Sequence, residues 1–198
     1  MIMKAKLDNM TAEELLKRYE TGERSFYNLN LEKADLRGVK LVEADLRRAN
    51  LRGADLRRAN LTGADLWRAD LRGANLRGAT LTRANLSGAD LTNADLSGAT
   101  LVETNLTQAN LTSALMFEAD LFMANLTEAM LAGANLTKAI LIGAILVEAI
   151  LVASILVRVN LTEADLRGAN LLEVDLTDTD LTVAKLKGLV MPNGSIYH

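Results

Sequence analysis

The sequence has no cysteine, one histidine and one proline among its 198 residues, and only 4% of the residues are aromatic. Without cysteine, the chain can form no disulfide and can use no thiolate as a nucleophile or metal ligand. The one histidine is His198, the last residue. Ser-His-Asp triads and histidine-bound metal sites are therefore close to excluded. We expect a protein that is not an enzyme and that has no cofactor and no metal site.

The sequence also has little net charge and carries little targeting information. The 22 basic and 25 acidic residues give a formal net charge of -3, which is too small to indicate a nucleic-acid binder. Residues 1–10 lack the apolar core of a secretory signal. Residues 139–157 form one long apolar run with a single charge, Glu148, and match a membrane helix in length. This run keeps the phase of the repeat described next, so we assign it to that repeat and predict a cytoplasmic protein.

A five-residue repeat dominates the chain. Leucine occupies 31 of the 32 positions spaced by five from Leu31 to Leu186, and Met116 takes the remaining one. A small residue, usually Ala, lies two positions before each leucine, and Asp or Asn lies directly before it. On an α-helix this spacing would spread leucines over every face, and on a flat strand it would alternate them between faces. All leucines can be buried only if the chain bends once every five residues. The period therefore predicts a solenoid with Leu and the small residue inside.

Units such as ADLRRANLRGADL, residues 44–56, resemble the pentapeptide-repeat family, and the resemblance extends over about residues 26–191. It implies an all-β solenoid, a right-handed quadrilateral β-helix of about eight coils with four pentapeptides each. The tail MPNGSIYH is similar to tails of family members from oxygenic photosynthetic bacteria. The resemblance also implies one alternative function, because some members imitate DNA and regulate type II topoisomerases such as gyrase.

The chain divides into three predicted parts. We expect an N-terminal cap at 1–25 with a helix at about 11–20, the β-helix at 26–186, and a closing segment at 187–198. Stacked coils leave unpaired backbone groups at both ends and therefore need caps.

Local signals support both caps. Thr11 and Glu14 have the spacing of a helix capping box, and Gly22 marks a helix stop. At the other end, Ile196 and Tyr197 follow a turn and are expected to fold over the last coil.

One coil lacks the usual polar residues, and it is our main candidate surface. Isoleucine replaces Asp or Asn four times in succession, the residue after each leucine is also apolar, and two phenylalanines extend this character toward the N-terminus. The candidate residues are Ile140, Ile142, Ile145, Val147, Ile150, Val152, Ile155, Val157, Phe117 and Phe122. A contiguous apolar surface indicates a protein partner or self-association. Two alternatives remain: contact with a membrane surface, or a belt of β-branched residues that merely favours extended structure.

Charged residues form weaker candidates. Arg37, Arg57 and Arg77 are expected to stack in one ladder, and Trp67 lies among arginines at an outward position. This ladder suggests an anion or nucleic-acid surface, but aspartates two residues before the arginines favour internal pairing. Residues 111–198 hold 5 basic and 10 acidic side chains, which is the observation behind the DNA-mimic alternative. We favour a general interaction scaffold over that alternative.

Overall fold

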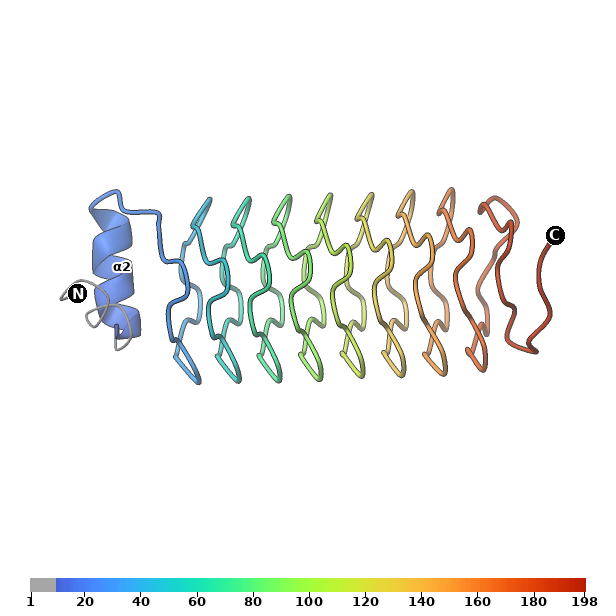
Figure 1. The fold of residues 1–198 in the computed structure, drawn as a ribbon, viewed down its shortest axis with the longest axis horizontal. Coiled ribbons are helices and arrows are strands. Elements are labelled where there is room, and N and C mark those ends of the chain that lie inside the picture. Colours follow the sequence, from blue (N-terminus) through green and yellow to red (C-terminus); the bar gives the residue numbers. More distant parts are fainter. Residues whose placement is uncertain (1–9) are drawn as a thin grey trace.

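The computed structural model describes residues 10–198. They form a straight rod of stacked coils, with helix α2 (Ala12–Glu20) across its N-terminal end and the C-terminal segment at the opposite end (Figure 1).

Parallel bridges join residues that lie 20 positions apart, from Ser25 with Asp45 to Asn170 with Val190. One turn of the solenoid therefore contains four pentapeptides, as predicted. Within residues 10–198, the pairing consists of isolated single-residue bridges and not of continuous strands. The reason is geometric, because the chain turns a corner before a longer strand can form.

The interior is built as the repeat predicts. The repeat leucines from Leu31 to Leu171 are all buried, and so is Met116, which takes the place of one of them. The residues two positions earlier are also buried from Val39 to Val174, and they include the polar exceptions Thr104 and Ser154. The core is therefore a solid column of Leu and Ala from one coil to the next.

The polar residue before each leucine stabilises the corner that follows. Its side-chain oxygen accepts a hydrogen bond from the backbone N–H two residues later, as Asn60 Oδ1 does from Thr62 N at 3.1 Å. The corner residue after that takes a left-handed backbone angle. Gly53 has a φ of 62°, but Arg58 has a φ of 56°, so residues other than glycine also occupy this position. The side-chain bond to the corner helps to hold this angle.

Helix α2 closes the N-terminal end. Thr11 caps it by accepting a hydrogen bond from Glu14 N at 3.2 Å, while the Glu14 carboxylate accepts from Arg18 Nε at 3.1 Å and not from the Thr11 backbone. Only half of the predicted capping box therefore forms. Leu15 is fully buried against the first coils, and the Tyr19 hydroxyl donates to Val42 O at 3.0 Å.

The C-terminal end is less well covered. Ile196 pairs with Val190 in an antiparallel bridge, so the tail does fold back on the last coil. However, Ile196 and Tyr197 stay 55% and 49% exposed, and Leu181 and Leu186 are only half-buried. A pocket of about 320 Å³ lies between the tail and these leucines.

The apolar run at 139–157 belongs to the solenoid and takes part in its bridges. Within residues 10–198, no helix has the length and apolarity needed to cross a membrane.

Candidate interaction surfaces

The isoleucine coil, residues 140–157, is exposed on every side of the rod. Ile140, Ile145, Ile150 and Ile155 hold the outward position before each leucine and are between 39% and 42% exposed. The apolar residues that follow the leucines are half-buried; they are Ile142, Val147, Val152 and Val157. The apolar residues that the sequence analysis singled out in this coil are thus exposed in the structure, and they surround the rod.

These isoleucines lack a side-chain hydrogen bond that the outward polar residues of other coils form. An isoleucine side chain cannot accept from the backbone N–H two residues later. Within residues 10–198, we find no acceptor for the N–H groups of Ile142, Val147, Val152 and Val157. Solvent can reach these corners, so the loss is modest. Neither burial nor backbone hydrogen bonding therefore accounts for the four isoleucines.

The bridges show how the four isoleucines differ. Three of them pair with an aspartate in a neighbouring coil: Ile140 with Asp120, Ile145 with Asp165, and Ile155 with Asp175. Ile150 instead lies between Met130 and Asn170, neither of which is charged. Ile150 is therefore the one isoleucine of this coil whose two bridge partners are both uncharged.

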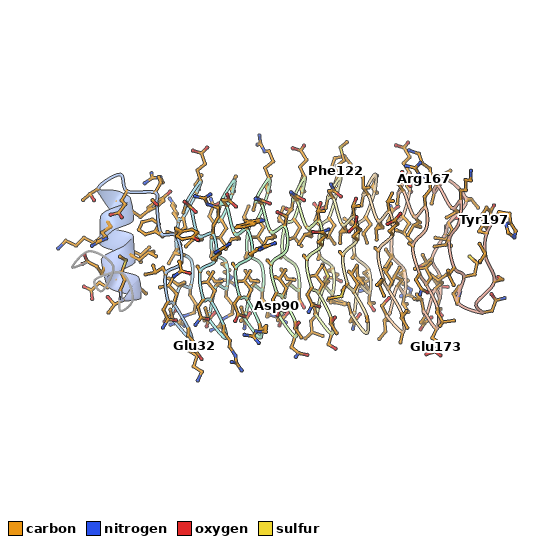
Figure 2. All side chains as sticks on the ribbon, viewed as in Figure 1. Glu32, Asp90, Phe122, Arg167, Glu173 and Tyr197 are labelled. Carbon is orange, nitrogen blue, oxygen red and sulfur yellow. The ribbon has the colours of Figure 1, made fainter. Side chains whose placement is uncertain are left out.

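We name the side of the rod that carries this residue the Ile150 face. It comprises the ladder of outward residues Asn110, Met130, Ile150 and Asn170, with the corner residues Thr112, Ser113, Ala132, Gly133, Val152, Ala153 and Leu172. No residue in this set is charged, and Met130 and Ile150 are 41% and 42% exposed. Asp90 and Glu173 bound the face along the rod. Figure 2 labels Asp90 and Glu173 in the lower half of the view and Phe122 and Arg167 at its upper edge; Arg167 lies at the corner that precedes Asn170 and therefore also borders this face.

Acidic side chains border one long edge of the Ile150 face. Glu128 and Glu148 occupy the preceding corner in successive coils, and both are exposed. Glu128 accepts a hydrogen bond from Gln108 Nε2 at 2.9 Å. Within residues 10–198, neither glutamate forms an ion pair, so both charges remain open to a partner.

The two predicted phenylalanines lie away from this face. Phe117 is at the corner after the Ile155 ladder, with the Lys138 ammonium 5.2 Å from its ring centroid. Phe122 follows Asp120, which accepts from its backbone N–H at 3.0 Å. The structure therefore distributes the predicted residues around the rod and does not gather them into one patch.

The arginine-rich coils are largely neutralised by internal pairs, as the sequence spacing suggested. Arg37, Arg47, Arg57 and Arg72 each lie 2.5–2.7 Å from the aspartate two residues earlier. The hydrogen bonds from Arg37 lower the pKa of Asp35 from 3.8 to about 2. The Arg47 side chain likewise lowers the pKa of Asp45.

The ladder of Arg37, Arg57 and Arg77 lines a surface pocket of about 570 Å³ together with Gly38 and Arg58. Sequence reasoning did not single out Arg58. The signal was present, because glycines lie 20 residues before and after it, at Gly38 and Gly78.

Trp67 is half-buried, and two neighbouring arginines of this chain lie against its ring. The guanidinium carbons of Arg48 and Arg68 lie 5.2 and 4.7 Å from its ring centroid. These cation–π contacts already occupy the ring, which weakens its candidacy as a partner anchor.

The repeat of this chain matches a known protein-family model. The model of the family described as pentapeptide repeats matches in eight copies, at residues 30–68, 59–98, 89–121, 119–156 and 154–188. Comparison with curated protein sequences gives no match.

Solved structures of several repeat proteins are similar. HetL, a pentapeptide repeat protein involved in heterocyst differentiation regulation in the cyanobacterium Nostoc sp. strain PCC 7120, is 34% identical, with 96% of this chain and 100% of HetL covered and a TM-score of 0.45. The protein alr5209, also from Nostoc PCC 7120, is 40% identical over 58% of this chain and 80% of its own, with a TM-score of 0.28. QnrB1, a plasmid-mediated fluoroquinolone resistance protein, is 19% identical over 77% of this chain and 80% of its own, with a TM-score of 0.54.

Pentapeptide repeat proteins fold as right-handed quadrilateral β-helices, which agrees with the 20-residue pairing observed here. Since the family model matches residues 30–188 without a gap, this chain belongs to the pentapeptide repeat family.

Proposed function

We propose that this protein is a non-enzymatic scaffold that binds a protein partner through the Ile150 face. The observation that carries the proposal is the exposure of Met130 and Ile150 on a ladder that has no charge from Asn110 to Asn170. Contiguous exposed apolar surface is uncommon on soluble proteins unless it contacts something. Asparagine at position 150 would satisfy the corner N–H, so isoleucine there has no evident benefit to the isolated rod.

The border of the face supports a proposal about the chemistry of the partner. Glu128 and Glu148 form no ion pair within residues 10–198, and Arg167, at the same corner one coil beyond Glu148, is paired with Asp165, so a partner that covers Ile150 should place Lys or Arg next to the glutamates. We therefore expect a protein segment with apolar side chains flanked by basic ones. An anionic membrane surface would be repelled by the same glutamates.

A second copy of this chain would be a poor partner for the glutamates that border the Ile150 face. If two rods paired antiparallel through this face, Glu128 and Glu148 would meet the same glutamates of the other copy. If the rods ran parallel, the glutamates would meet Gly133 and Ala153. Neither arrangement places an unpaired positive charge opposite the glutamates, because Arg167 at the same corner is paired with Asp165, so the charges favour a different protein.

Selection from a random peptide display library tests this proposal. Wild-type protein should enrich sequences that combine apolar residues with Lys or Arg, and an Ile150→Asn variant should lose these binders. Ile140→Asn is the matched control, because it makes the same change beside Asp120 on another face. Enrichment of acidic peptides, or equal loss of binding in both variants, would contradict the assignment to this face.

Self-association and membrane contact are tested in parallel. The wild-type protein should sediment as a monomer and should not bind anionic liposomes. A dimer that Ile150→Asn converts into a monomer would show that the partner is a second copy and would overturn the partner chemistry proposed here.

DNA mimicry toward gyrase is the second candidate, and the acidic excess of residues 111–198 is the observation in its favour. Against it, the arginines of the other half are exposed even where they are paired, and Arg58 adds an open positive charge. We expect gyrase supercoiling to be unaffected by micromolar protein; inhibition would revive this candidate.

A further inference from the structure

The pocket in the arginine ladder lies on another part of the rod and is independent of the Ile150 face. Four arginines line it, Arg37, Arg57, Arg58 and Arg77. Successive coils lie about 4.8 Å apart, so these arginines stand close enough to contact one small ligand together.

The charges of this pocket do not balance. The four arginines face three carboxylates, those of Asp35, Asp55 and Asp95. The ladder is interrupted because Asn75 stands where Asp would pair with Arg77. Arg77 instead reaches Asp95 in the next coil, where its Nη1 lies 3.4 Å from Oδ2. One positive charge is therefore left over.

That charge belongs to Arg58. Within residues 10–198, Arg58 has no ion pair and no side-chain hydrogen bond. The neighbouring corner positions are Gly38 and Gly78, which carry no side chain that could cover it. A methyl group on Gly38 would meet nothing within 4 Å, so the space beside Arg58 is open.

The neighbouring arginines are held in place and still have donors to offer. Arg37 and Arg57 each use Nε and Nη2 on their own aspartates, at 2.5–2.8 Å. Among the residues that the structure describes, their Nη1 groups have no acceptor and remain available. Because the aspartates already fix these side chains, a ligand would not have to order them on binding.

We propose that this pocket binds a phosphate monoester. A carboxylate has two oxygens and is satisfied by a single arginine fork. A phosphomonoester has three terminal oxygens and nearly two negative charges, so it can accept from Arg57, Arg58 and Arg77 together. The surplus charge at Arg58 and the unused donors beside it match that requirement.

Titration with inorganic phosphate, followed by NMR of the arginine Nε–H and backbone resonances, tests the site. Phosphate should shift the resonances of the pocket residues, and Arg58→Gln should weaken binding about tenfold, as for loss of one charged hydrogen bond. Arg83→Gln is the matched control. Arg83 has the same corner geometry, with a φ of 57° against 56° for Arg58, but lies 3.9 Å from Glu103 and outside the pocket.

A second variant tests the charge argument without removing an arginine. Asn75→Asp would restore the missing carboxylate and keep the corner hydrogen bond to Arg77 N. It should also weaken phosphate binding. If acetate or dimethyl phosphate at equal ionic strength shifts the same resonances as strongly, the site has no preference for a monoester and the proposal is wrong. Equal binding by wild type and Arg58→Gln would also overturn it.

Discussion

Two coils of this rod share one interior and differ in their exterior. In the coil at 60–77, all four outward residues accept a hydrogen bond from the backbone of the following corner, as Asp70 does from Arg72. In the coil at 140–157, four isoleucines make no such bond. Leu71 and Leu151, at equivalent positions of the two coils, are nevertheless both fully buried. The inside of the repeat thus determines the fold, and the outside is free to vary with function.

The strongest test of this comparison is to truncate one buried leucine in each of the two coils. Leu71→Ala and Leu151→Ala should each lower the free energy of unfolding by about 3 kcal/mol, since each leaves a leucine-sized cavity in a tightly packed column. Chemical denaturation of the two variants measures this. A clearly smaller effect at Leu151 would mean that the isoleucine coil is packed differently from the polar one.

Two polar residues inside the column should respond with opposite sign. Thr104 and Ser154 both replace the usual buried Ala, but Thr104 Oγ1 donates to Leu81 O at 2.7 Å. Within residues 10–198, the Ser154 hydroxyl has no partner. Thr104→Ala should therefore destabilise the protein by about 1 kcal/mol, and Ser154→Ala should stabilise it by about as much. Thermal or chemical unfolding gives both values, and a loss of stability in Ser154→Ala would point to a buried water as its partner.

The polar coils should also be the acid-sensitive ones. Arg47 and Arg72 lower the pKa of Asp45 and Asp70, chiefly through side-chain hydrogen bonds. A lowered pKa means that the folded state favours the ionised carboxylate. This stabilisation is present above the usual aspartate pKa of 3.8 and is lost as the pH falls below it.

The double variant Asp45→Asn/Asp70→Asn isolates this contribution. Asparagine keeps the corner hydrogen bond but has no charge, so the variant should lose less stability than wild type between pH 6 and pH 2. The difference should be about 1 kcal/mol, because both arginine partners are nearly half exposed to solvent. Denaturant unfolding at the two pH values measures it, and identical losses in the two proteins would show that the pairs do not contribute.

The interior was predictable because a five-residue period has few ways to bury every leucine. The neighbours of each outward residue depend on the number of residues per turn, which the period alone does not give. Ile150 and Ile145 look alike in the sequence, yet one lies beside Met130 and Asn170 and the other beside Asp165. The position of Arg58 between two glycines follows from the same 20-residue step. The incomplete cover at Leu181 depends on how a short tail packs, and no local pattern specifies that.

The smallest expected change in stability is that of Ile150→Asn. Measuring it shows whether Ile150 serves the stability of the rod or the binding of a partner. Ile150→Asn should restore the hydrogen bond to Val152 N that the polar coils make and should remove an exposed apolar side chain. Loss of β-branched packing opposes these gains, so we expect a net stabilisation of only about 0.5 kcal/mol. Hydrogen exchange at Val152 should slow in the variant. If Ile150→Asn instead destabilises the rod by more than Leu151→Ala does, the isoleucine supports the fold, and its exposure would no longer argue for a partner.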